Sequence, residues 1–178
     1  MGQVTKQIIK YPPGYEPNYI LPEKHCSYRF ALGRIGKNPL IAICMNPSRA
    51  EEKCSDRTIN RIISISKQLG ADGWMVFNLY PERATDAKTL SEYNESISSQ
   101  NIKYICDYLV NNNITEVWGA WGDDKRIESL KIAKQNLLKV LSDKEIKIYY
   151  FGTLTKGGNP RHPLQRFEKW NIYEKHYL

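Results

Sequence analysis

Four short apolar runs, each followed by a polar segment, are the clearest feature of the hydropathy pattern. They lie at 40–43, 74–77, 116–122 and 146–151. Runs of this length that are rich in aliphatic and aromatic side chains predict buried strands. The third run contains two glycines, Gly119 and Gly122, which allow another backbone or a ligand to approach closely. We therefore expect four core strands.

Between these runs, apolar residues recur every three or four positions, which is the pattern of an amphipathic helix. The periodic segments are Ile59–Leu69, Ile102–Val110 and Ile127–Leu141. Ser55 or Asp56 is placed to cap the first helix, and Gly70 is placed to end it. Strands that alternate with helices predict a mainly parallel sheet. The expected fold is a three-layer α/β domain with a short, four-stranded sheet between helices.

The two ends of the chain differ in character from its centre. Residues 1–27 are rich in proline and predict an irregular arm. Residues 28–35 partly alternate between apolar and polar side chains, which favours an extra antiparallel strand at the N-terminal edge of the sheet. Residues 166–178 form an aromatic and basic tail without a clear pattern. Residues 28–165 are then expected to form one α/β domain, a normal size for a single core.

Charge and composition narrow the classes of function. The net charge is +7, which favours an anionic partner such as nucleic acid. No apolar run approaches the roughly 18 residues of a membrane helix, and residues 1–6 lack the apolar core of a signal peptide. We therefore expect a cytoplasmic protein with no membrane partner. The cysteines lack the spacing of a zinc or iron–sulfur site, and we expect no metal and no cofactor.

Polar side chains follow each of the four expected strands. In a parallel sheet these carboxyl ends meet at one edge, where α/β proteins bind ligands. The residues expected to converge there are Asn46, Ser48, Asn78, Trp121, Lys156, Arg161 and His162. Amides read the edge of a base, aromatic rings stack on its face, and cationic side chains hold phosphates. The set suits a base or a nucleotide better than a metal ion.

Each of these residues also has a purely structural interpretation. Asn46 precedes a proline and would then tie a turn, while Asn78 would bond loop backbone. His162 would be a solvated loop residue, and Trp121 would belong to the core. The acidic residues in the same loops are Asp56, Asp86 and Asp123–Asp124. We expect all of them to cap or begin helices. For Asp56 and Asp86 the alternative is a catalytic carboxylate.

Seven short motifs follow one another in a distinctive order. They are Tyr28-Arg29-Phe30, Met45-Asn46-Pro47-Ser48, Asn78-Leu79, Arg83-Ala84-Thr85-Asp86, Ala120-Trp121-Gly122, Leu154-Thr155-Lys156-Gly157 and Pro160-Arg161-His162-Pro163-Leu164. This order resembles a bacterial and phage family known as domain-of-unknown-function family 1643, over about residues 28–165. The chain departs from the family pattern at Ser55-Asp56-Arg57-Thr58, where Asp-Asp-Pro-Thr is expected. The motifs add Arg83 to the possible site residues, and the family name implies no function.

A more distant resemblance is to the uracil-DNA glycosylase superfamily. The similar motifs are the Asn46-Pro47-Ser48 turn, the strand that ends at Asn78, the Trp118-Gly119 and Trp121-Gly122 turns, and His162-Pro163-Leu164. Cys44 stands where that superfamily has a glycine, and Leu164 stands where it has a serine. The resemblance implies a uracil-DNA glycosylase-like fold and the cleavage of an N-glycosidic bond without a metal.

The superfamily resemblance also implies a role for each residue. Asn46 would position a water near the anomeric carbon, and His162 would donate a hydrogen bond to the departing base. The implied base-binding residues are Asn78, Ser48, Tyr80 and Trp121, and the implied phosphate-binding residues are Arg49, Lys156 and Arg161. We expect a hydrolase that acts on a damaged or modified base in DNA. The alternatives are a nonenzymatic binder of nucleotides or modified DNA, and an enzyme acting on a free nucleoside or nucleotide.

Overall fold

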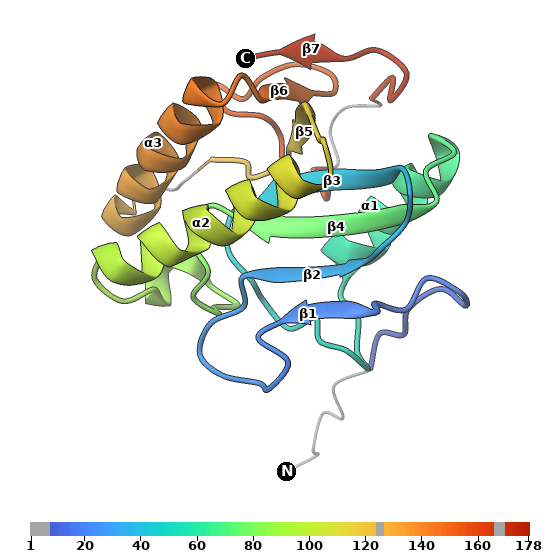
Figure 1. Ribbon diagram of the computed structural model, residues 1–178, viewed down its shortest axis with the longest axis horizontal. Helices are drawn as coiled ribbons and strands as arrows, with labels where there is room; N and C mark the ends of the chain where they lie inside the picture. The colour runs from blue at the N-terminus through green and yellow to red at the C-terminus, as the bar shows by residue number, and fades with distance from the viewer. Residues whose placement is uncertain (1–7, 124–126, 166–169) are drawn as a thin grey trace.

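A seven-stranded mixed sheet runs through the part of the chain that the structure, a computed structural model, describes: residues 8–123, 127–165 and 170–178. The strand order is β1-β2-β4-β3-β5-β6-β7 (Figure 1), which places β3 at the centre. The strands are β1 (Tyr19–Leu21), β2 (Ala31–Arg34), β3 (Pro39–Cys44), β4 (Gly73–Asn78), β5 (Glu116–Gly119), β6 (Lys147–Tyr150) and β7 (His176–Tyr177).

The four strands expected from the apolar runs, β3, β4, β5 and β6, form the parallel centre of the sheet. Three further strands extend it, because β2 pairs antiparallel with β4, β1 with β2, and β7 with β6. The four parallel strands and the antiparallel strand expected within residues 28–35, which is β2, are present, but the sheet is larger than expected and β2 is not its edge. β1 comes from the proline-rich arm and β7 from the tail. These strands have three and two residues, too few to show a periodic pattern.

Helices cover both faces of the sheet. They are α1 (Arg57–Gln68), α2 (Glu95–Asn111) and α3 (Glu128–Asp143), with a 3₁₀ turn, η1 (Ala87–Thr89), between β4 and α2. Strand residues such as Leu40 and Trp74 pack with α1 on one face, while Ile41 and Met75 pack with α2 and α3 on the other. Figure 1 shows α2 in front of the sheet and α1 behind it. The predicted α/β class is confirmed.

The helix starts follow from local capping. Asp56 caps α1 by accepting a hydrogen bond from the Ile59 amide at 2.8 Å, as predicted. The start expected at Asp123–Asp124 is wrong, since α3 begins at Glu128 and the Asp123 carboxylate bonds a different loop; Asp124 lies outside the described residues. None of the described helices has the length and apolar character that a membrane crossing requires.

Candidate functional site

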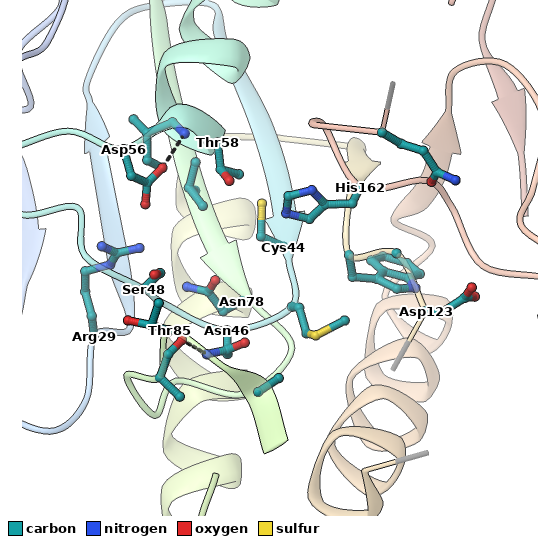
Figure 2. A pocket seen from close by; sticks show the side chains of 18 of the residues that line it. Arg29, Cys44, Asn46, Ser48, Asp56, Thr58, Asn78, Thr85, Asp123 and His162 are labelled. Carbon is teal, nitrogen blue, oxygen red and sulfur yellow. Dashed lines mark hydrogen bonds between the residues drawn. The ribbon is translucent and has the colours of Figure 1, made fainter. Parts of the chain in front are cut away.

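A cavity of about 590 Å³ lies at the carboxyl ends of the parallel strands. The loop after β3, the end of β4, the turn after β5, the loop after β6 and the first turn of α1 all contribute to its wall. Figure 2 shows these segments around one hollow. The structure brings Asn46, Asn78 and His162 together here, with Ser48 and Trp121 also in the wall. Distant parts of the sequence therefore share one site, as strand topology predicted.

Asn78, the last residue of β4, is fully buried and lines the cavity. Neither its Oδ1 nor its Nδ2 has a hydrogen-bond partner among the described residues. The alternative that this side chain bonds loop backbone does not hold among the described residues; the Asn101 Nδ2 bond, at 2.9 Å, goes to the backbone carbonyl of Asn78 and not to its amide. Leaving a buried amide unpaired costs about 1–3 kcal/mol, so it calls for a partner that enters the cavity.

Asn46 has a clear structural task. Its Nδ2 donates to the backbone carbonyls of Ala84 at 2.8 Å and Pro47 at 3.1 Å. These bonds tie the turn after β3 to the loop after β4. Within the described residues its Oδ1 accepts no hydrogen bond, and the residue lines the cavity. One end of the amide thus clamps two loops, and the other end is available to a ligand or a water.

Arg29, just before β2, is a site residue that the sequence reasoning missed. It is 2% exposed, lines the cavity, and donates through Nη1 to the backbone carbonyl of Ala50. Its Nε has no partner among the described residues. Burial, followed by the nearby charge of Arg83, lowers the pKa of Arg29 to about 10. The guanidinium therefore remains a buried cation at neutral pH. In the sequence, the only signal for this role of Arg29 is its position between two aromatic residues.

His162 and Trp121 reach the cavity from loops that are bonded together. The Gly122 amide donates to the Pro160 carbonyl at 2.9 Å, and Trp121 Nε1 donates to Asn159 Oδ1 at 3.2 Å. His162 Nδ1 accepts from the Leu164 amide at 3.3 Å, which places the proton of a neutral imidazole on Nε2. Figure 2 shows this ring pointing into the hollow near Cys44. Trp121 is 1% exposed and belongs to the core as well.

The acidic residues divide between capping and the cavity wall. Asp56 caps α1 and also lines the cavity. Asp86 caps η1 by accepting from the Lys88 amide at 3.1 Å, and it is not part of the wall. Asp123 lines the cavity, where it accepts from Thr155 Oγ1 at 2.5 Å. In residues 8–123, 127–165 and 170–178, no group of three His, Cys, Asp or Glu side chains is arranged to hold a metal.

Besides Asp86, five of the sequence-predicted residues lie outside the cavity wall. Tyr80 is 1% exposed and its hydroxyl accepts from the Asn94 amide at 3.0 Å, so it does not present its ring to this hollow. Arg161 donates to the Thr153 carbonyl at 2.8 Å, which holds it against its own loop. Lys156 is exposed, and Arg49 and Arg83 line a second hollow that shares Ser48, Ala84 and Thr85 with the first.

Comparisons with known proteins place the chain in a family without giving it a function. A family model described as a protein of unknown function (DUF1643) matches residues 29–164, which is most of the chain and contains the whole cavity wall except Gln165. No curated protein and no solved structure matches the sequence. The motif order that resembled this family is thereby confirmed. The chain belongs to the DUF1643 family, whose function is unknown.

Proposed function

We propose that the cavity recognises a single nucleobase, and that the protein hydrolyses the N-glycosidic bond of a damaged or modified base in DNA. The observation that carries this proposal is the fully buried amide of Asn78, which has no hydrogen-bond partner in the described part of the chain. An amide offers one donor and one acceptor side by side, which is the pattern of the edge of a base. A base that pairs with this amide removes the cost of leaving it unsatisfied.

The shape and lining of the cavity support a base as the ligand. Its volume of about 590 Å³ falls within the range of roughly 300–1,000 Å³ typical of small-molecule sites. The wall combines apolar side chains, such as Met45, Ile59 and Val76, with polar groups at the ends of strands. The similarity to the uracil-DNA glycosylase superfamily in the order of the Asn46, Asn78 and His162 motifs supports the same conclusion. Fold likeness alone does not define chemistry, and the proposal depends on the site.

The proposed reaction adds water across the bond between the base and the sugar. As that bond breaks, its electron pair leaves with the base, and positive charge develops on the sugar. His162 donates a hydrogen bond from Nε2 to the base carbonyl where the negative charge collects. A water held by Asn46 Oδ1 attacks the anomeric carbon, and the Asp56 carboxylate accepts the proton that this water loses. Solvent then protonates the released base anion.

Access to a base in DNA requires that the nucleotide be extruded from the helix, and cationic residues beside the cavity support this step. Arg49 is exposed in the adjoining hollow, and Arg83 lines the same hollow. The net charge of +7 adds long-range attraction to the phosphate backbone. We expect the DNA strand to cross this second hollow while the base occupies the first.

One observation favours a second function, a nonenzymatic binder of the same base. The Nδ2 of Asn46 is occupied by backbone carbonyls, so Asn46 is required for the loop geometry whether or not it holds a water. Such a binder would use Asn78 and Trp121 in the same way and would not turn over. The distinction lies in catalysis rather than in the shape of the cavity.

A single-turnover cleavage assay, run beside a calorimetric measurement of binding to the same oligonucleotides, separates these functions. Duplex and single-stranded oligonucleotides carrying a broad panel of modified bases are incubated with excess protein, and abasic sites are revealed by alkaline strand cleavage. We expect cleavage at one class of base, reduced at least about a hundredfold by His162→Gln and by Asn78→Ala, as for the loss of a preorganised hydrogen bond. Base-selective binding without any cleavage supports the binder, and no base-selective binding contradicts both functions.

A further inference from the structure

We propose that the end of the cavity formed by Arg29 is a phosphate-binding subsite, which holds the phosphate attached to the nucleotide whose base Asn78 recognises. The identity of the phosphate as part of a nucleotide depends on the proposed function, but the anion site itself does not. The proposal follows from one buried guanidinium, that of Arg29, and one half-buried guanidinium, that of Arg83, which share one acceptor and have few anionic partners among the described residues.

Arg29 is a buried cation that forms no ion pair with the described residues. It is 2% exposed, and no carboxylate of the described residues lies within 4.0 Å of its guanidinium. One nitrogen donates to the Ala50 carbonyl, and Nε has no partner among the described residues. Burying a guanidinium without a compensating anion is costly. In Figure 2 its head group lies at the side of the hollow where Asp56 and Ser48 are drawn.

A second guanidinium increases the excess of positive charge. Arg83 Nη1 lies 3.5 Å from the Ala50 carbonyl that also accepts from Arg29. The Nε of Arg83 likewise has no partner in the described part of the chain. The nearest carboxylate to Arg83 is that of Glu51, at 3.8 Å, which also contacts His25 at 3.0 Å. Two like charges converge on one neutral oxygen, and an anion between them would relieve their repulsion.

The first turn of α1 adds backbone donors to the same end of the cavity. Thr58 and Ile59 line the same cavity as Arg29, and the amino end of a helix attracts anions. Asp56 is the opposing group: its carboxylate accepts from the Ile59 amide and its charge favours the protonated form of Arg29. Hydroxyl groups of Ser48 and Thr58 supply further donors to an oxyanion. Guanidinium and hydroxyl donors at the amino end of a helix together match the chemistry of a phosphate group.

A phosphate at this position has two possible sources. It is either the terminal phosphate of a free nucleotide or a phosphodiester of an extruded nucleotide in DNA. The terminal phosphate carries up to two negative charges, and its nucleotide fits entirely inside the cavity. The phosphodiester carries one negative charge, and the DNA strand on either side of it must run out of the cavity. Arg83 lines the adjoining hollow that shares Ser48, Ala84 and Thr85 with the cavity, so both routes pass the same guanidinium pair.

The test compares ligands that differ only in the phosphate. Calorimetry measures the affinity of the protein for inorganic phosphate, for the deoxynucleosides, for their 5′-monophosphates and for oligonucleotides containing the same nucleotides. We expect each monophosphate that binds to do so about tenfold to a hundredfold more tightly than its nucleoside, the gain of charge-assisted hydrogen bonds. Arg29→Gln should abolish this difference, and Lys103→Gln, which removes an exposed charge on α2, should preserve it.

The wild-type protein keeps the test decisive even if Arg29→Gln does not fold. Arg83→Gln then serves as the second variant, and crystals soaked with tungstate are expected to show an anomalous peak beside the Arg29 guanidinium. Equal affinity for nucleosides and monophosphates, together with no peak at Arg29, overturns the subsite. Phosphate bound at Arg29 without any preference among bases contradicts the role of Asn78 and leaves the subsite standing. If Arg29→Gln loses affinity for the monophosphate, the phosphate belongs to a free nucleotide. If it loses affinity for the oligonucleotide, the phosphate is a phosphodiester of DNA.

Discussion

Asn78 lies directly opposite Cys44 in the parallel pairing of β4 with β3. Residues that face each other across two strands point to the same side of a sheet, and Cys44 packs on the α1 side. The register therefore places the Asn78 amide beside the first turn of α1, at the end of the sheet that opens into the cavity. This amide is fully buried and has no hydrogen-bond partner within residues 8–123, 127–165 and 170–178, so it lowers the stability of the fold and can contribute to binding a ligand.

Replacing this amide by an apolar side chain should separate stability from function. Asn78→Leu removes two buried polar atoms that have no partner among the described residues, so we expect the free energy of unfolding to stay level or rise by about 1 kcal/mol. Base-selective binding should be lost. Urea denaturation and calorimetry measure the two effects. A variant that is less stable by about 2 kcal/mol and still binds with wild-type selectivity would assign Asn78 to the core alone.

Gly122 is expected to control the position of His162. Its φ is +72°, and a Cβ at this position would lie 3.1 Å from the His162 Cβ. Gly122→Ala therefore adds a close contact to a backbone strain of about 1–3 kcal/mol. The matched control is Gly14→Ala, because Gly14 has φ +78° and open space around its Cβ. We expect both variants to lose stability, and only Gly122→Ala to lose ligand binding or cleavage; equal losses of function would show that the contact with His162 is unimportant.

Asn159 joins the turn after β5 to the loop that carries His162. Its Oδ1 accepts from Trp121 Nε1 at 3.2 Å and Lys134 Nζ at 2.9 Å, and its Nδ2 donates to Asp123 Oδ1 at 3.1 Å. Asn159→Ala should cost about 1–3 kcal/mol, because the buried Nε1 of Trp121 loses its acceptor and the partly buried Lys134 loses a bond at the same time. Thermal denaturation measures this loss.

A matched control for this cluster is Asn136→Ala. Asn136 is an exposed residue of α3 with one bond, to the Tyr93 hydroxyl at 3.0 Å, and its loss should stay within about 0.5 kcal/mol. If the two variants are equally stable, the side-chain bonds of Asn159 contribute nothing to the stability of the fold. Asn159→Ala should loosen the loop that carries His162 and leave Asn78 in place. Abasic-site formation by this variant should therefore fall more than its affinity for the base does.

The buried thiol of Cys44 predicts a loss of stability in alkaline solution. Burial raises the pKa of Cys44 from 9.0 to about 12, so the folded protein keeps a proton that the unfolded chain releases. This stabilisation is complete below pH 9 and disappears as the pH rises through 12, with a slope of at most about 1.4 kcal/mol per pH unit. Buried tyrosines add slopes of the same sign, so the difference from Cys44→Ala isolates the thiol. Identical slopes between pH 9 and 11 would contradict the assignment.

The sequence predicted the parts of the fold that local patterns encode. The apolar runs that became β3, β4, β5 and β6, and the cap at Asp56, are readable because strands and helices leave a period and a start signal. β1 and β7 were missed because each depends on pairing with a strand far away in the sequence. The convergence of Asn46, Asn78 and His162 followed from parallel topology. Arg29 was missed because the hydropathy of a charged residue predicts exposure, whereas its burial depends on tertiary contacts.

The most direct measurement follows the side-chain amide of Asn78 by nuclear magnetic resonance. In ¹⁵N-labelled protein its Nδ2 signals are identified by their absence from Asn78→Asp, and nucleosides carrying normal and modified bases are titrated in. We expect a base bound by the protein to shift the Nδ2 protons of Asn78 downfield, as a new hydrogen bond forms. Asn78 signals that stay in place at saturation with a bound nucleoside, while other signals move, would contradict the claim that this amide recognises the base.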